Sequence, residues 1–129
     1  MKNRTHVILC EDSFGIVAKD EEGEIQAMCM ADTFSVDACC VHLAIDNPYV
    51  LKYGFFQEVA QLLFIQKKRE RLFGLVPDNN EKAIKLDKHI GFKEVTRIPD
   101  ALMDGIGYIV MRMDKNDCRW LEEVPHGIH

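Results

Sequence analysis

The N-terminal third of the chain alternates between apolar and polar positions with the period of two that is typical of β-strands. Three such runs are predicted, over residues 5–10, 14–19 and 24–34, with polar turns between them. The next run, 38–45, is apolar on both faces except for His42, which is typical of a central strand that is covered on both sides. Consecutive strands before any helix predict a mixed sheet.

The period changes after Pro48. From Gly54 onward, Phe55, Val59 and Leu62 recur at the spacing of an amphipathic helix. A buried strand over 72–76 follows this helix. A strand, a crossover helix and a second strand predict a parallel pair joined by a right-handed connection.

The C-terminal part repeats the order of helix and strand. Asn80 is predicted to cap a second helix, which Gly91 ends. Strands are then predicted over 92–98 and 107–113, and a short closing turn or helix over 117–121. The polar loop between the two strands contains Pro99, Asp104 and Gly105. The whole pattern predicts a single-domain α+β fold, with a central mixed sheet flanked by helices.

The length of 129 residues suits one domain, which we expect over 1–121, followed by a tail over 122–129. The formal net charge of −5 argues against nucleic acid as a partner, because phosphate contacts need clustered cations. Apolar runs are too short for a membrane helix, and the N-terminus does not resemble a signal peptide. We therefore expect no membrane association and a cytoplasmic location.

The five cysteines include no CxxC pair, so the spacing does not predict a metal site. We expect reduced thiols that pack as small apolar side chains.

A candidate anion site lies where the first helix begins. The first amides of a helix have no partner within it, and Gly54 would let a phosphate approach the backbone. Lys52 could add a positive charge. The alternative is that Gly54 only relieves strain in a turn between strand and helix.

The second half of the chain carries more specific matches. Asn80 and Ala83, followed by Gly91 and Phe92, resemble the Asn-x-x-Ala and Gly-Phe positions of the GNAT N-acetyltransferase superfamily. The resemblance covers approximately residues 38–113 and implies an N-terminally shortened GNAT-like fold.

The resemblance implies acetyl-coenzyme A as a substrate, with its pantetheine arm between the strands over 38–45 and 72–76. The pyrophosphate would bind at the amides of residues 52–56, Asn80 would line the pantetheine side, and amides of residues 44–46 would polarise the thioester carbonyl. The implied binding residues are Ala44, Ile45, Lys52, Tyr53, Gly54, Phe55, Phe56, Asn80 and Ala83.

Three positions depart from the family pattern. Leu51 replaces a polar residue of the phosphate turn, and Phe56 replaces a small one. A phenylalanine there would crowd a pyrophosphate unless its ring turned into the core. Asp87 stands where the family often has a tyrosine that protonates the leaving thiolate. A carboxyl of ordinary pKa, about 3.9, is ionised at pH 7 and cannot donate a proton.

His42 is the candidate general base, since histidine exchanges protons near pH 7. The alternative is a hydrogen-bonded core histidine. Tyr108 and Tyr53 are candidate proton donors, although tyrosines in such positions usually pack. The basic group Lys67, Lys68, Arg69 and Arg71 could meet the 3'-phosphate of coenzyme A or a nucleic acid, but a solvated helix end is the favoured interpretation.

Two functions follow. The first is an N-acetyltransferase that transfers acetyl from acetyl-coenzyme A to an amine of a small molecule or protein. The second is a catalytically inactive GNAT-like binding or structural protein, such as a phage assembly or virion component. The ending Cys118-Arg119-Trp120 resembles that of some short acetyltransferase-like proteins of bacteria and phages. The short N-terminal half also predicts an uncovered sheet face, buried in a homodimer or against a larger assembly.

Overall fold

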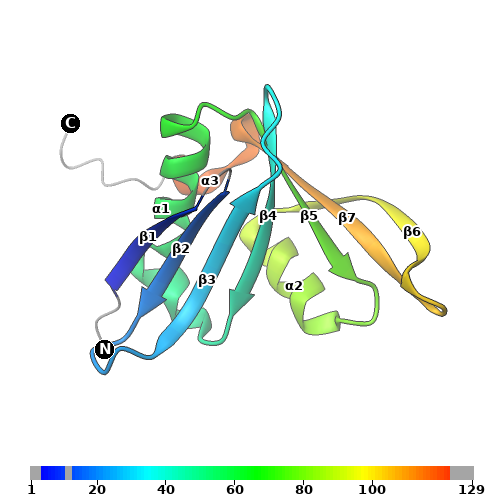
Figure 1. The fold of residues 1–129 in the computed structure, drawn as a ribbon, viewed down its shortest axis with the longest axis horizontal. Helices are drawn as coiled ribbons and strands as arrows, with labels where there is room; N and C mark the ends of the chain where they lie inside the picture. The colour runs from blue at the N-terminus through cyan, green and yellow to red at the C-terminus, as the bar shows by residue number, and fades with distance from the viewer. Residues whose placement is uncertain (1–3, 11–12, 123–129) are drawn as a thin grey trace.

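One mixed sheet forms the centre of the protein (Figure 1). The computed structural model describes residues 4–10 and 13–122. The sheet in this part of the chain has seven strands in the order β1-β2-β3-β4-β5-β7-β6, and only β4 and β5 run parallel. The strands are β1 (Arg4–Cys10), β2 (Ser13–Lys19), β3 (Ile25–Asp32), β4 (Ala38–Ile45), β5 (Arg71–Pro77), β6 (Lys93–Met103) and β7 (Ile106–Asp114). The predicted α+β class and mixed sheet are confirmed.

Helical segments follow both strands of the parallel pair. A 3-10 helix after β4 leads into α1, which continues directly into a π-helical segment before β5, and α2 joins β5 to β6. The helical elements are η1 (Pro48–Tyr53), α1 (Phe55–Ala60), η2 (Gln61–Gln66), α2 (Glu81–Ile90), η3 (Lys115–Asp117) and α3 (Arg119–Glu122). Of the predicted tail, residues 123–129 lie outside the described part of the chain.

All three α-helices pack on the same face of the sheet. Cys29 of β3 and Val41 of β4 belong to one core cluster with Phe56 of α1, Ile90 of α2 and Trp120 of α3. The Trp120 ring lies 5.8 Å from the Phe56 ring, centroid to centroid, and its indole N–H donates to the Ile90 carbonyl at 2.7 Å. The predicted closing helix therefore packs against α1 and α2 and joins them in one layer.

The opposite face of the sheet has no helical cover from the described residues. There, Met28 pairs with Ala44 and Met30 with His42 across β3 and β4, and Met28, Ala44 and His42 are exposed. The expectation that the strand over 38–45 is covered on both sides is wrong for this face. Small and sulfur-containing side chains make β4 look apolar here, without a second helical layer to cover them.

The hairpin of β6 and β7 is longer than predicted. The expected polar loop around Pro99 is part of β6, and the turn is confined to Asp104 and Gly105. An irregularity in the β6–β7 pairing between Ile98 and Met103 accommodates the proline, which an edge strand tolerates because its missing N–H would face solvent. β6 can therefore continue through Pro99, although the sequence there lacks the alternation that predicts a strand.

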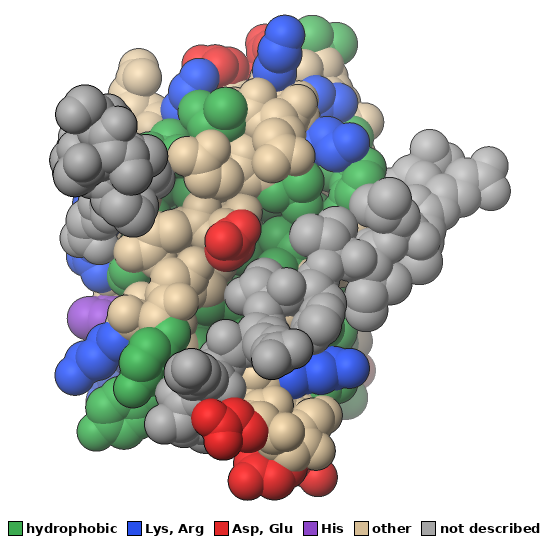
Figure 2. Space-filling model, turned by 90° about the vertical axis from the view of Figure 1, so that its left-hand side faces the viewer, with side chains coloured by type: hydrophobic (Ala, Val, Ile, Leu, Met, Phe, Trp, Pro, Cys, Tyr) green, Lys and Arg blue, Asp and Glu red, His purple; other side chains and the backbone are tan. Residues whose placement is uncertain are grey.

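The surface mixes charges of both signs. On the face shown in Figure 2, lysine and arginine side chains occur in small groups among acidic, hydrophobic and other side chains. Within the described residues, none of the helices has the length and apolar character needed to cross a membrane.

Candidate acetyl-transfer cleft

A cleft opens where the two parallel strands separate. β4 and β5 pair only over their first residues, from Ala38 with Arg71 to Cys40 with Phe73. Beyond these pairs, residues 41–45 and 74–77 line opposite sides of a cavity of about 340 Å³. Its remaining wall comes mainly from α2. The parallel pair that the sequence predicts thus creates an opening in the middle of the sheet.

One line of residues on α2 faces this cleft. The Asn80 side chain caps the helix by accepting the Ala83 N–H at 3.1 Å. Ala83 lies one turn further along, and Asp87 one turn beyond it, so the spacing of three and four residues places them on one face. All three line the cavity. The predicted positions of Asn80 and Ala83 are therefore brought together with a residue that sequence reasoning had set aside.

Asp87 is the one buried charged residue among those whose burial the structure describes, with 9% of its surface exposed. No hydrogen bond or ion pair to its carboxyl occurs within the described residues. Burial removes water from the carboxylate and raises the pKa of Asp87 from 3.8 to about 6. The carboxyl therefore departs from the ordinary one assumed from the sequence, because desolvation shifts its equilibrium toward the neutral acid, although most of it is still ionised at pH 7.

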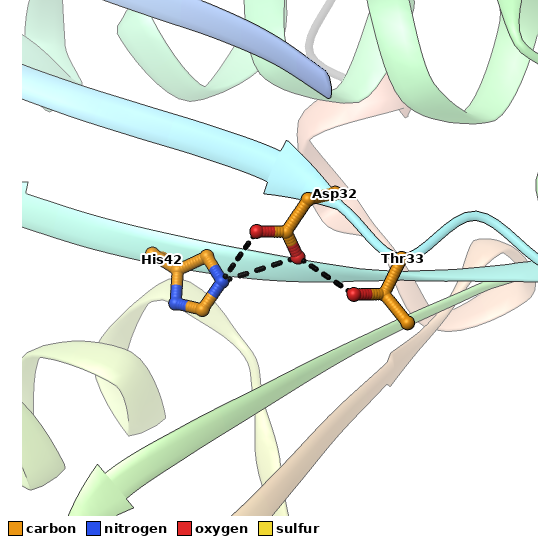
Figure 3. Close-up of polar contacts among 3 residues, drawn as sticks. All are labelled: Asp32, Thr33 and His42. Carbon is orange, nitrogen blue, oxygen red and sulfur yellow. Dashed lines mark hydrogen bonds and ion pairs between the residues drawn. The ribbon is translucent and has the colours of Figure 1, made fainter. Parts of the chain in front are cut away.

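His42 projects from β4 into an exposed ion pair (Figure 3). Its Nε2 lies 3.1 Å from Asp32 Oδ2, and the Thr33 hydroxyl donates to Asp32 Oδ1 at 3.1 Å. The His42 side chain is 55% exposed, so the alternative of a core histidine is excluded. When Nε2–H donates to Asp32, Nδ1 keeps its lone pair and can accept a proton.

The backbone of β4 offers amides to the cleft. Asp46 N–H donates to the Gln26 carbonyl at 2.9 Å, so it is not available to polarise a carbonyl, contrary to expectation. Hydrogen-bonded pairs recur at every second residue of an antiparallel ladder, so Ala44 also directs its amide toward β3. The same alternation directs the Ile45 amide toward the cleft. Of the amides predicted at residues 44–46 to polarise the thioester carbonyl, only the Ile45 amide is therefore directed toward the cleft.

The turn before α1 has a specific backbone geometry. Gly54 has φ +91°, and its N–H donates to the Val50 carbonyl. The glycine therefore ends the 3-10 helix and starts α1, and its own amide is occupied. Lys52 and Tyr53 precede it with exposed side chains, and neither lines the cleft.

The unpartnered amides at this turn belong to the first residues of α1. Phe55, Phe56 and Gln57 occupy positions whose N–H groups have no intrahelical acceptor. The Phe56 ring is fully buried and packs edge-on against Phe92, at 6.2 Å between centroids. The ring has therefore turned into the core and does not crowd the turn, so this substitution leaves the amide region open.

Other candidates lie away from the cleft. Tyr108 of β7 pairs with Pro77 and does not line the cavity. Two members of the basic group, Lys67 and Arg69, contact aromatic rings, with Lys67 Nζ 4.0 Å from the Phe14 centroid. These side chains follow the C-terminal end of the α1–η2 helix, opposite the end that offers free amides.

Burial makes two cysteines of the sheet poor nucleophiles. Burial raises the pKa of the Cys29 thiol, and it raises the pKa of Cys39 to about 12. No cluster of three or more potential metal ligands occurs among the residues that the structure describes.

Searches against protein-family models and against curated protein sequences found no match. Structural comparison did find similar folds. The spermidine/spermine N-acetyltransferase SpeG from Vibrio cholerae superposes with a TM-score of 0.70 at 12% identity, covering 86% of this chain and 70% of that one. A GNAT-family protein from Desulfovibrio desulfuricans gives 0.69 at 11% identity, covering 81% and 70%.

A third similar structure is the ribosomal-protein-S5-alanine acetyltransferase from Vibrio fischeri, with a TM-score of 0.69 at 16% identity, covering 84% of this chain and 64% of that one. Taken with the strand order and the cleft between β4 and β5, these similarities show that the chain has the GNAT acyl-CoA N-acyltransferase fold.

Proposed function

We propose that the protein is an acetyl-CoA-dependent N-acetyltransferase, which acts on an amine of a small molecule or a protein. The observation that carries the proposal is the cleft between the separated strands β4 and β5, with His42 on one wall and the capped start of α2 on another. Fold similarity to N-acetyltransferases supports the same activity.

The cleft is suited to a thin, flexible ligand. Ala44 and Ile45 on β4, with Asn80 and Ala83 on α2, would hold the pantetheine arm between backbone groups and small side chains. The Ile45 amide would donate to the thioester carbonyl, where negative charge develops during transfer. Acetyl-coenzyme A would supply the activated acetyl group.

The start of α1 would receive the pyrophosphate. The N–H groups of Phe55 and Phe56 have no acceptor within the helix, and the helix dipole also favours an anion at this end. Gly54 keeps the approach free of a side chain, and the exposed Lys52 and Tyr53 flank it. This arrangement uses five of the predicted binding residues, although the Gly54 amide itself bonds to Val50.

His42 would act as the general base. Asp32 accepts its Nε2–H and so fixes the ring with Nδ1 free to take a proton from the attacking amine, directly or through water. An amine is protonated in solution, and only its neutral form can attack. Tyr108, the second predicted catalytic residue, lies outside the cavity and is not needed for this step.

Two amines, chosen from the names of the structurally similar enzymes, test which class of acceptor the protein acetylates. Spermidine and a peptide with an N-terminal alanine represent the small-molecule and protein classes. Purified protein is incubated with acetyl-coenzyme A and each amine, and the acetylated product is measured by mass spectrometry. A lysine-containing peptide library extends the panel.

We expect one class to be acetylated by the wild type, with a large loss in His42→Ala. The matched control is His89→Ala, because His89 is exposed on α2 and does not line the cleft. No enzyme-dependent product with any amine in the panel would argue for the inactive binding protein. The expected cytoplasmic location also stays a prediction, which cell fractionation tests.

A further inference from the structure

Thr33, the residue directly after β3, has a backbone conformation that threonine disfavours. Its φ of +50° lies in the left-handed region, where a β-branched side chain crowds the backbone. Glycine or asparagine would occupy this position with less strain. The Thr33 side chain is exposed, so packing in the core does not account for a threonine here. Strain of this kind persists where the surrounding structure holds it, and it is most frequent at functional sites.

The residues that follow Thr33 hold this conformation in place. The Phe34 ring packs edge-on against the Phe14 ring, at 5.5 Å between centroids, and both rings pack against the core. The Ser35 N–H donates to the Ala38 carbonyl at 2.8 Å, which closes the turn into β4. Because the turn is anchored on both sides, Thr33 keeps the left-handed conformation between the end of β3 and the Phe34 ring.

The Thr33 hydroxyl binds the same carboxylate that His42 contacts (Figure 3). It donates to Asp32 Oδ1 at 3.1 Å, whereas His42 Nε2 lies 3.1 Å from Oδ2 and 3.3 Å from Oδ1. Since Oδ1 already accepts the hydroxyl, Oδ2 is the better acceptor for the ring N–H. The Asp32 side chain is 36% exposed, and the torsion that turns a carboxylate has a broad distribution. The hydroxyl therefore restricts a carboxylate that packing leaves free to turn.

We propose that Thr33 is a positioning residue for His42, which acts through the Asp32 carboxylate. The inference rests on the proposed role of His42 as the general base. The hydroxyl holds the carboxylate, and the carboxylate accepts the Nε2–H of the ring. Nδ1 is thereby kept as the nitrogen that takes a proton from the amine. Thr33 itself contacts no reacting atom.

The first test is a set of substitutions at Thr33, measured by steady-state kinetics. Thr33→Val removes the hydroxyl and keeps the shape of the side chain. It should lower kcat about tenfold with little change in KM, because the base is still present but less well oriented. Thr33→Ser keeps the hydroxyl and should retain the wild-type kcat. Thr33→Gly suits the φ of +50°, so it should lose activity as Thr33→Val does without losing stability.

A double substitution distinguishes positioning from a general structural effect. If Thr33 acts through Asp32, Thr33→Val should cause no further loss of kcat in an Asp32→Asn enzyme, whereas independent effects would multiply. Thr96→Val, at an exposed threonine of β6, is the matched control and should keep the wild-type kcat.

Two kinetic results would overturn the proposal and leave the acetyltransferase function intact. One is a kcat for Thr33→Val within about twofold of the wild type, and the other is a full further loss of about tenfold in the Asp32→Asn enzyme. Absence of activity in the wild type itself would instead count against the proposed function.

A second test needs no catalysis. Nitrogen NMR of the imidazole ring reports which nitrogen carries the proton in neutral His42. The wild type and Thr33→Ser should show the Nε2–H form, whereas Thr33→Val and Thr33→Gly should show a mixture with the Nδ1–H form, because the carboxylate is no longer held as the acceptor. His89, exposed on α2, is the internal control, and its signals should be the same in every variant. A His42 ring with the same protonated nitrogen in Thr33→Val as in the wild type would contradict the positioning role.

Discussion

His42 and Asp87 line the same cleft from different elements, His42 from β4 and Asp87 from α2. The environments of the two side chains differ. His42 is exposed and bound to Asp32, whereas Asp87 is buried and has no bonded partner among the described residues. The surface position of His42 and the burial that raises the pKa of Asp87 thus give one cleft two chemically different polar side chains.

Replacement of the buried acid should stabilise the protein at neutral pH. Burial raises the pKa of Asp87 from 3.8 to about 6, so ionisation lowers stability as pH rises through this window, and the cost is fully present above it. Asp87→Asn has no charge to bury. We expect its free energy of unfolding to exceed that of the wild type by about 2 kcal/mol at pH 8 and to match it near pH 4.

Urea denaturation at both pH values measures this difference. Glu81→Gln removes an exposed acid from the same helix and should show no such pH-dependent gain. Equal stability of Asp87→Asn and wild type at pH 8 would mean that water reaches the carboxyl.

Loss of the candidate base should reduce turnover without unfolding the protein. His42 is exposed, so His42→Ala should change stability little, while kcat should fall by about 10²–10⁴-fold. Asp32→Asn should cause a smaller decrease, because it weakens the orientation of the ring and leaves the base present. Steady-state kinetics with the acetylated amine check both values, and a His42→Ala enzyme within a few-fold of the wild type would remove His42 from the reaction.

Gly54 should be needed for the shape of the turn before α1. A Cβ at this position would meet only Gln57 Oε1, at 3.9 Å, so space is not the obstacle. The φ of +91° is the obstacle, because side chains disfavour that backbone conformation by about 1–2 kcal/mol. Gly54→Ala should lower the free energy of unfolding by about that amount and weaken coenzyme A binding. Unchanged stability would show that the turn relaxes without the glycine.

The uncovered face of the sheet leads to a prediction about assembly. Leu75 of β5 and Ile98 of β6 are about half exposed, and Met28 of β3 is also exposed. A homodimer that buries this face is expected from the sequence, and light scattering at increasing protein concentration tests it. Leu75→Asp should then shift the mass toward the monomer. A wild-type monomer at high concentration would contradict the expectation.

Much of the fold could be predicted because each element depends on a local pattern. The alternation over β3, the helical spacing after Gly54 and the cap at Asn80 are all visible in the sequence. The extension of β6 across Pro99 could not be predicted, since it depends on pairing with β7. The uncovered face of β4 was missed because apolar composition does not reveal whether a second helical layer exists.

The candidate site was only partly predictable for a similar reason. Asn80, Ala83 and Asp87 were all noted through the resemblance, although Asp87 was set aside as an ordinary carboxylate. The raised pKa of Asp87 could not be predicted from the sequence, because desolvation depends on the cleft walls that β4 and β5 contribute. The occupied amides of Gly54 and Asp46 likewise follow from hydrogen bonds that only the folded chain displays.

The most direct test of the acetyltransferase account is calorimetric titration of the protein with coenzyme A, in the wild type and in a variant with a blocked cleft. Ala83→Trp places a bulky ring in the cavity, whereas Lys85→Trp adds the same ring to an exposed position on the same helix. The account predicts saturable binding to the wild type and Lys85→Trp, and loss of binding in Ala83→Trp. No heat from the wild type at millimolar coenzyme A, or undiminished binding in Ala83→Trp, would contradict it.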